Sequence, residues 1–388
     1  MIKKIILVLL IIGLGIGTYF YFDNSSVENS NKKESKKETV KLTDSDIEKS
    51  MFKKYYQKAI KTVSKMTTEE KVGQLFLVRY NYSDTEYLSN FNPGGYILFA
   101  KDFENHTKES MRKELVSVNK KNKYPLILGV DEEGGFVTRV SRFKEFRTEK
   151  FKAPKDYYEE GGEILLRQIE EEKAKLLKNI GINLNLAPVA DVSTNENDFI
   201  YNRTFGRDAK ETSELIREMV KVANEVHINS CLKHFPGYGN NVDTHTGIAI
   251  DERDYDNFKK NDFLPFEAGI KANVPSILVS HNVVKCMDDK YPASLSKNVI
   301  KELRDTLNFT GIIMTDDLAM DAVKAYVEDG KAATLAINAG NDMIITSDFM
   351  TMYKEVLQSI NDKEISMDTL NKATIRVIAW KYYSDIMD

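Results

Sequence analysis

Two histidines, a lysine and a carboxylate lie close together in one short stretch of this chain. The stretch runs from Lys233 and His234 through a Pro-Gly-Tyr-Gly turn to Asp243 and His245. Its proline and glycines favour a loop over a helix or a strand. An imidazole has an unperturbed pKa of about 6.5, so a histidine beside a carboxylate can give and take a proton near neutral pH. We therefore expect an acid/base site in which Asp243 orients His245; the alternative is a solvated turn whose histidines only satisfy local hydrogen bonds.

A second carboxylate motif ends an apolar run further along the chain. In the segment Gly311–Met320, apolar residues lead into Asp316 and Asp317 before apolar residues return. Aspartate is a favoured N-cap residue, so one of the two could simply cap the next helix. We expect Asp316, at the tip of a strand, to point into a site and Asp317 to be the cap.

Short apolar runs alternate with amphipathic segments from about Ile47 onward. Near-continuous apolar strands are typical of a parallel sheet that is buried on both faces. Eight such units predict a single (β/α)8 TIM-type barrel over residues 47–388, with C-terminal helices after Met350. A doubly wound sheet is the alternative. The eight expected strands are Gly73–Val78, Gly95–Ala100, Leu126–Asp131, Asn183–Val189, Cys231–Phe235, Ser276–His281, Gly311–Asp316 and Asp342–Thr346.

Polar residues follow these strands where each strand ends. A barrel brings the carboxyl ends of all its strands to a single face, which is where barrel enzymes place their active sites. Random scatter would put polar residues in loops at both ends instead. The residues that converge in this register are Asp131, Asp191, Arg203, Lys233, His234, His281 and Asp316.

The bulk composition excludes several classes of function. Of the 388 residues, 42% are hydrophobic and 29% are charged, as in an ordinary soluble domain. The net charge of −4 and the lack of a basic stripe argue against a nucleic-acid partner. The two cysteines, Cys231 and Cys286, are too few for a disulfide framework or a four-thiolate zinc site. We expect two structural thiols, no metal and no organic cofactor.

The first 46 residues differ from the rest. Lys3 and Lys4 precede Ile5–Phe22, 18 residues without a formal charge, which is long enough to cross a bilayer. A short buried helix is the alternative. Residues 24–46 are rich in Lys, Ser, Glu, Asn and Thr, a composition that cannot bury a core. We expect residues 1–23 to be a transmembrane anchor or signal segment and residues 24–46 to be a polar, disordered tether.

Taken together, the motifs resemble those of family 3 glycoside hydrolases, specifically the bacterial β-N-acetylglucosaminidase (β-hexosaminidase) branch. The resemblance covers roughly residues 50–385 and depends on the motifs occurring in order, since any one alone is a weak signal. They are Asp131-Glu-Glu-Gly-Gly135 with Arg139, Asn202-Arg-Thr-Phe-Gly206, Lys233-His-Phe-Pro-Gly237 with Asp243-x-His245, and Thr315-Asp-Asp-Leu318.

The resemblance implies a retaining double displacement. Asp316 matches the nucleophile that forms a covalent glycosyl-enzyme, His245 matches the general acid/base, and Asp243 matches its partner. A retaining glycosidase needs its nucleophilic carboxylate roughly 5 Å from the acid group, and Asp316 and His245 would have to meet that condition. The residues that match the family's sugar contacts are Asp131, Arg139, Arg203, Lys233 and His234.

The larger β-glucosidases of the family take an acid residue from a further domain, as the resemblance implies. The tail after Met350 predicts only two helices, so we expect the acid to come from the Asp243/His245 pair, which favours an N-acetylglucosaminidase. The chain departs from the family pattern at Phe136, where an arginine is common, and at Tyr238, where a histidine is usual. Neither change touches the three expected catalytic residues.

The leading hypothesis is therefore hydrolysis of terminal, non-reducing β-linked N-acetylglucosamine, with peptidoglycan fragments as the expected source. A β-glucosidase, or a phosphorolytic N-acetylglucosaminidase of the same family, is the enzymatic alternative. A catalytically dead wall-binding module is a third possibility, against which Asp316, Asp243 and His245 argue. We expect a monomer outside the cytoplasm, anchored in the membrane through the N-terminal segment or secreted, with a carbohydrate as its partner.

Overall fold

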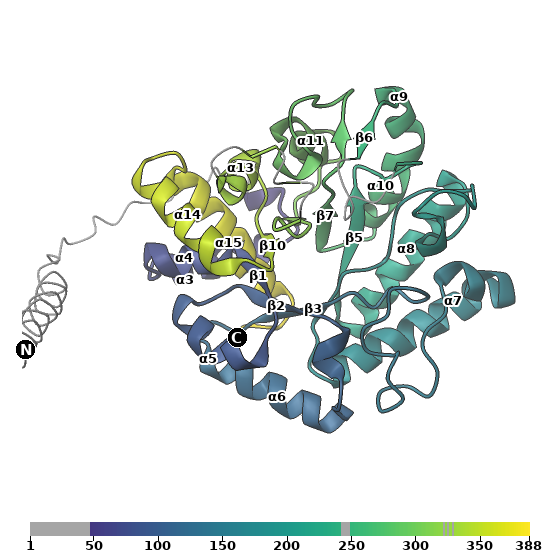
Figure 1. The fold of residues 1–388 in the computed structure, drawn as a ribbon, viewed down its shortest axis with the longest axis horizontal. Helices are drawn as coiled ribbons and strands as arrows, with labels where there is room; N and C mark the ends of the chain where they lie inside the picture. The colour runs from purple at the N-terminus through teal and green to yellow at the C-terminus, as the bar shows by residue number, and fades with distance from the viewer. Residues whose placement is uncertain (1–46, 242–248, 321–322, 324–325, 328–329) are drawn as a thin grey trace, which may run out of the picture. The chain divides into compact units, whose positions relative to one another are not determined.

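A curled sheet of eight parallel strands forms the centre of the protein, with helices around it (Figure 1). The structure is a computed structural model, and it describes residues 47–241, 249–320, 323, 326, 327 and 330–388. The strands are β1 (Phe76–Arg79), β2 (Gly95–Leu98), β3 (Ile127–Val130), β4 (Leu184–Asn185), β5 (Asn229–Phe235), β7 (Ser276–Val279), β9 (Ile312–Thr315) and β10 (Ile344–Thr346).

The sheet nearly closes on itself. Its order is β10-β1-β2-β3-β4-β5-β7-β9, and every pairing is parallel. The two end strands come together through a parallel bridge between Met314 and Met343. Since a doubly wound sheet keeps its edges apart, this bridge excludes that alternative and fits a TIM-type barrel. All eight strands lie where the sequence predicted them, within a few residues.

The helices follow the strands in the order expected for β/α units. The break in α7 comes from Gly161 and Gly162, whose backbone angles are not helical. The helices are α3 (Lys53–Val63), α4 (Thr68–Gln74), α5 (Thr85–Leu88), α6 (Lys108–Lys121), α7 (Pro154–Asn179), α8 (Ala209–Val226), α9 (Tyr255–Asn257), α10 (Phe263–Lys271), α11 (Lys297–Lys301), α13 (Ala332–Ala339), α14 (Phe349–Asn361) and α15 (Met367–Tyr383).

Two corrections concern the predicted boundaries. The first strand begins three residues later than expected, because Gly73 belongs to α4, where a Cβ would lie 2.0 Å from the carbonyl oxygen of Phe91. A small second sheet pairs β6 (Ile250–Asp251) with β8 (Val283–Val284), and strands of two residues carry too little pattern to predict. The two expected C-terminal helices are present as α14 and α15.

The barrel strands bury alternate residues in two separate apolar clusters. Leu77, Leu278 and Met314 belong to the cluster that fills the barrel, whereas their strand neighbours pack against the surrounding helices. Helix α15 closes the amino end of the barrel, where the indole nitrogen of Trp380 donates to Asn229 Oδ1 at 2.8 Å. The opposite, carboxyl end is therefore the end left for a site.

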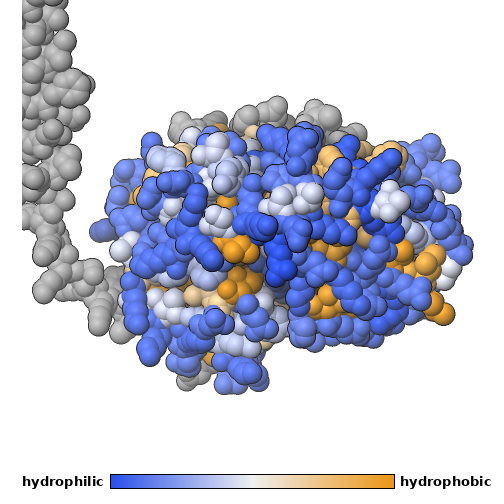
Figure 2. Space-filling model, turned by 90° about the horizontal axis from the view of Figure 1, so that it is seen from below, coloured by the Kyte–Doolittle hydropathy of each residue, from blue (hydrophilic) through white to orange (hydrophobic). Residues whose placement is uncertain are grey.

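The surface agrees with the charge content of the sequence. The face shown in Figure 2 is mostly hydrophilic, with small, separate hydrophobic patches between the charged residues. Within the described ranges, no helix is both long and apolar enough to cross a bilayer. The predicted anchor, residues 1–23, and the predicted tether, residues 24–46, lie outside the described residues.

Candidate active site

Side chains alternate between the two faces of a strand, and on three strands this alternation points a charged residue into the barrel mouth. Cys231 faces the barrel interior with Met314 and Ile127, so Lys233, Asp316 and Asp131 continue the same inward series at the carboxyl ends of β5, β9 and β3. Burial raises the pKa of the Cys231 thiol to about 12, and the charges of Lys233, Asp131 and Asp316 all act on it. The three charged groups therefore lie within electrostatic reach of one buried sulfur.

Lys233 is the centre of a buried ion-pair network. Its Nζ lies 2.7 Å from Asp131 Oδ1 and 2.6 Å from Glu133 Oε1. Burial alone would lower the pKa of Lys233, but the two carboxylates outweigh burial and raise it, so the ammonium stays charged. The network thus presents the Lys233 ammonium and the Asp131 carboxyl group to the mouth of the barrel.

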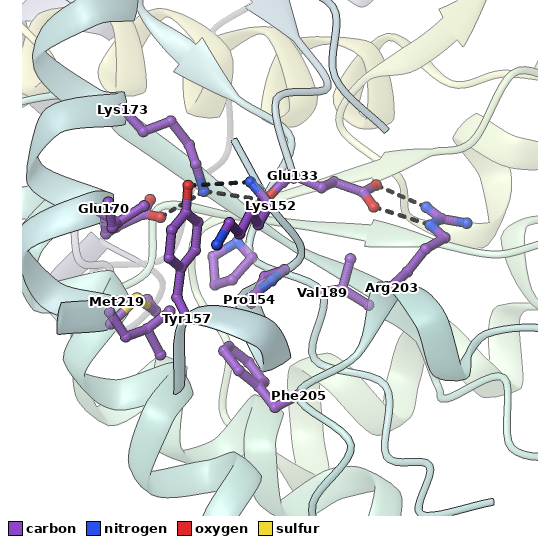
Figure 3. A pocket seen from close by; sticks show the side chains of 14 residues that line it. Glu133, Lys152, Pro154, Tyr157, Glu170, Lys173, Val189, Arg203, Phe205 and Met219 are labelled. Atoms are coloured by element: carbon purple, nitrogen blue, oxygen red, sulfur yellow. Dashed lines mark hydrogen bonds and ion pairs between the residues drawn. The ribbon is translucent and has the colours of Figure 1, made fainter. Parts of the chain in front are cut away.

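Glu133 links this cation to Arg203. The guanidinium Nε and Nη2 of Arg203 donate to the two carboxylate oxygens of Glu133 at 3.0 and 2.8 Å (Figure 3). Burial would raise the pKa of Glu133, yet Arg203 and Lys233 hold it well below the ordinary value. Glu133 is therefore an ionised bridge between two cations, a role the sequence motif alone did not assign.

His234 is held by partners on both of its ring nitrogens. Nδ1 lies 2.7 Å from Asp191 Oδ2, and Nε2 lies 3.1 Å from Arg203 Nη2. Because Arg203 can only donate, His234 Nε2 must accept a hydrogen bond from it. Nδ1 therefore carries the ring hydrogen and donates a hydrogen bond to Asp191. Burial is the largest influence on His234 and lowers its pKa, which agrees with a neutral ring near pH 7.

Arg139 is positioned through its backbone by Glu132. The buried Glu132 carboxylate accepts from the backbone nitrogens of Arg139 and Val140, each at 2.7 Å, and from the backbone and hydroxyl of Ser141. The Arg139 side chain then reaches Asp131, with Nη2 3.9 Å from Oδ2, and lies over the ring of Phe99. Its buried Nε has no hydrogen-bond partner among the described residues.

Asp316 and Asp317 make different backbone contacts at the end of β9. The Asp316 backbone nitrogen donates to the Val279 carbonyl at 3.0 Å, which continues the β9 ladder to the tip of the strand. Asp317 Oδ1 accepts from the backbone nitrogens of Ala319 at 2.9 Å and Ser347 at 3.1 Å, so it caps the turn at Leu318 and Ala319. His281 supports this turn, with Nε2 3.1 Å from the Asp317 carbonyl oxygen.

A small pocket lies behind the Glu133–Arg203 pair (Figure 3). Lys173 reaches it from α7 and contacts Glu170 at 2.9 Å and the Glu133 carbonyl oxygen at 3.1 Å. Asp131, Lys233 and Asp316 are not among the residues that line this pocket. We therefore infer that this pocket is not the reaction site, and that Lys173 within it supports the Glu133 backbone.

The structure thus joins all five predicted sugar contacts in one network. Asp131 contacts both Lys233 and Arg139, Glu133 joins Lys233 to Arg203, and Arg203 contacts His234. Asp243 and His245 lie outside the described residues. The described part of the chain holds no group of three or more His, Cys, Asp or Glu side chains that could bind a metal ion.

Comparisons with known proteins agree with this architecture. Residues 67–380 match the Glycosyl hydrolase family 3 N terminal domain. A β-hexosaminidase of Nitrosomonas eutropha is 31% identical over 295 residues, which are 74% of this chain and 83% of that protein. A β-hexosaminidase A of Pseudoalteromonas piscicida is 30% identical over 67% of this chain, but the match spans only 47% of that protein.

A solved structure supports the fold. The family 3 β-N-acetylglucosaminidase of a Paenibacillus species superposes with a TM-score of 0.77 at 24% identity, covering 83% of this chain and 63% of that one. The motifs, the barrel and the matched domain lead to one assignment. The family that the sequence predicted is confirmed: the chain is a glycoside hydrolase and belongs to glycosyl hydrolase family 3.

Proposed function

We propose that this protein is a β-N-acetylhexosaminidase that releases terminal, non-reducing β-linked N-acetylglucosamine with retention of configuration. The observation that carries the proposal is the network of Asp131, Lys233 and Arg203 at the barrel mouth, with Asp316 in the same inward series. The β-hexosaminidase relatives support the choice of sugar.

The network suits a ring of hydroxyl groups. The Asp131 carboxyl oxygens can accept hydrogen bonds from sugar hydroxyls, while Lys233, Arg139 and Arg203 can only donate. The neutral His234 ring keeps its Nε2 as an acceptor from Arg203 and so orients that guanidinium. Such charge-assisted bonds are stronger than those between neutral groups, so they favour a sugar ring that presents free hydroxyl groups to them.

Asp316 is the proposed nucleophile. One of its oxygens attacks the anomeric carbon, and the bond from that carbon to the leaving oxygen breaks. Oδ1 accepts from the Asp317 backbone nitrogen at 2.8 Å, which favours the ionised carboxylate. A covalent glycosyl-enzyme results, and water later displaces Asp316 from the same carbon to restore the original configuration.

The sequence supplies the proposed acid/base. His245 donates a proton to the leaving oxygen in the first step and takes a proton from water in the second, with Asp243 as its partner. Both residues follow Lys233 and His234 within 13 positions of the chain.

We also propose where the enzyme works. Residues 1–23 would anchor the chain or direct its export, and residues 24–46 would tether a monomeric domain outside the cytoplasm. Peptidoglycan fragments would then be the natural source of terminal N-acetylglucosamine. Protease accessibility on intact cells, compared with lysed cells, tests the location: protection on intact cells would contradict it.

Hydrolysis of nitrophenyl N-acetyl-β-glucosaminide, compared with the matching β-glucoside, tests the activity. The acetamido substrate should have the higher kcat/KM, and faster cleavage of the glucoside would reject the proposal. Product analysis in phosphate buffer separates the remaining alternative. Free N-acetylglucosamine supports hydrolysis, whereas the sugar 1-phosphate would show the phosphorolytic form of the reaction.

A further inference from the structure

Arg253 lies at the centre of a buried cluster just beyond the small sheet. Its Nε is 3.0 Å from both carboxylate oxygens of Asp251, and its Nη2 is 2.7 Å from Asp251 Oδ2. Its Nη1 donates to both oxygens of Asp262 at 3.0 Å. The guanidinium also stacks over the buried ring of Phe258, with Cζ 4.4 Å from the ring centroid. Such a fork of donors holds several partners in one fixed geometry.

The same guanidinium reaches back to the end of β5. Its Nη2 donates to the carbonyl oxygen of Gly237 at 3.2 Å. Asn241 adds a second link, because its Nδ2 donates to Asp251 Oδ2 at 2.7 Å and to the Tyr238 carbonyl at 2.8 Å. Residues 237–241 and 251–253 are therefore joined to each other and, through Asp262, to the π-helical turn η5 (Phe258–Asp262).

Two glycines leave room for these contacts. A Cβ on Gly237 would lie 2.3 Å from Asp262 Oδ1, and a Cβ on Gly239 would lie 2.4 Å from Arg253 Cζ. Both glycines have a positive φ, of 123° and 55°, which other residues rarely adopt. Gly239 thus leaves room for the guanidinium, and Gly237 leaves room for the Asp262 side chain.

The cluster needs its cation. Asp251 and Asp262 are almost completely buried, and among the described residues one guanidinium, that of Arg253, pairs with both carboxylates. Burial raises the pKa of Asp262 to about 6 even though Arg253 opposes the shift. Removing the guanidinium would leave two buried like charges side by side.

The cluster also connects to the sugar site. The Tyr238 backbone nitrogen donates to Asp191 Oδ1 at 2.7 Å, and the other oxygen of Asp191 holds His234. A series of hydrogen bonds therefore runs from Arg253 through residues 237–238 to the barrel mouth. A displacement of about 1 Å in a catalytic group can reduce a rate by about 10²-fold, so such a path matters for proton transfer.

We propose that Arg253 is a positioning residue for the acid/base step, because it fixes both ends of the segment between Gly237 and Asp251 that carries Asp243 and His245. The inference rests on the proposed function of His245. Arg253 itself does not contact the substrate in this proposal. Its effect should depend on how much the leaving group needs a proton.

Substitution R253K tests this dependence. The lysine keeps the charge but cannot hold Asp251, Asp262 and Gly237 together. With chitobiose, whose sugar leaving group needs a proton, kcat/KM should fall at least about 10-fold more than with nitrophenyl N-acetyl-β-glucosaminide, whose leaving group needs little help. Equal losses for both substrates, or no loss, would overturn the proposal.

Substitution R304K is the matched control. Arg304 is also a buried guanidinium, paired with Asp342 at 2.7 Å and bonded to the carbonyls of Phe309 and Gly311 before β9, at the closed end of the barrel. Its loss should reduce the free energy of unfolding and lower kcat/KM for both substrates by the same factor. If R253K does not fold, N241A can replace it, because this variant removes only the link through Asn241. Its kcat/KM should also fall more with chitobiose than with the nitrophenyl substrate, by a smaller factor than in R253K.

Amide hydrogen exchange gives a readout that does not need activity. In R253K, peptides covering residues 238–241 and 249–253 should exchange faster than in the wild type, and in R304K they should not. Unchanged exchange in R253K would overturn the role of Arg253 while leaving the proposed function standing. A folded wild type that cleaves neither substrate would instead overturn the proposed function and, with it, the catalytic role of Arg253.

Discussion

The ammonium nitrogen of Lys233 lies 2.7 Å from Asp131 Oδ1, although 102 residues separate the two in the chain. The contact exists because β3 and β5 end at the same face of the barrel and both residues continue the inward-facing series of their strands. It places a hydrogen-bond acceptor and a cation side by side, at the distance of a charge-assisted hydrogen bond.

Replacing Lys233 by methionine should remove both stability and sugar binding. The change leaves Asp131 and Glu133 close together without the central cation, and breaking a buried pair in this way typically costs about 3–5 kcal/mol. Denaturant unfolding should show a loss in that range, and kcat/KM should fall by at least about 10²-fold. A variant of native stability and native KM would contradict the network described here.

Glu132→Gln tests whether Arg139 depends on its backbone anchor. The amide can no longer accept all four hydrogen bonds from residues 139–141, so we expect a loss of about 1–3 kcal/mol in unfolding free energy. KM should rise more than kcat falls, since Arg139 would move relative to Asp131.

The matched control is Glu355→Gln. Glu355 Oε1 accepts from the nitrogen and the hydroxyl of Thr334, both at 2.7 Å, between α13 and α14. This variant should lose stability without a change in KM. If both variants alter KM equally, the effect comes from general loosening of the barrel, and Glu132 has no particular role.

Asp316→Ala should lower kcat by about three orders of magnitude or more, because the covalent step is lost. Azide supplied in the assay can take the place of the missing carboxylate and attack the anomeric carbon from the same side. The product expected from this variant is therefore the α-glycosyl azide. Turnover close to wild type, or only a β-azide, would remove Asp316 from the role of nucleophile.

The buried Lys381 should make the free energy of unfolding depend on pH. Burial lowers its pKa to about 7, and its Nζ donates to the neutral Gln74 Oε1 at 2.7 Å. Between pH 7 and about 10.5 the unfolded chain holds a proton at Lys381 that the folded chain has mostly lost, so folding stability from this group rises with pH.

Comparison with Lys381→Met isolates that contribution. From pH 7.5 to 9.5, the unfolding free energy of the wild type should increase by about 2 kcal/mol relative to the variant. Denaturant titrations at several pH values measure the difference. A constant difference across this range would show that Lys381 keeps its ordinary pKa in the folded protein.

The sequence predicted the strands well because buried parallel strands are nearly continuous apolar runs. Their ends were harder to place. Gly73 reads as the start of an apolar run, yet it belongs to a helix in which only glycine fits beside Phe91. In β4 only Leu184–Asn185 pair regularly, since the segment predicted there continues through Ala187 and Pro188, and a proline cannot donate to the ladder.

The position of the site could be predicted because the strand ends converge at one face of the barrel. The hydrogen bonds and ion pairs that connect its residues could not. Asp131, Lys233 and Arg203 could be placed there from strand order alone. The bridge through Glu133 and the anchor at Glu132 depend on partners that are distant in the chain, such as Lys233 and Arg203 for Glu133, and sequence spacing does not reveal such pairs. Two adjacent carboxylates directly after a buried strand were the available signal. Arg253 gave none, because nothing in its local sequence distinguishes it from a surface arginine.

Trapping the intermediate tests the central claim most directly. Incubation with a 5-fluoro N-acetylglucosaminyl fluoride, followed by proteolysis and peptide mass spectrometry, should find one sugar attached to Asp316. The label should be absent from Asp316→Ala and from wild type protected by free N-acetylglucosamine. A folded, active enzyme that carries the sugar on another residue, or that forms no adduct and releases an inverted product, would contradict the account.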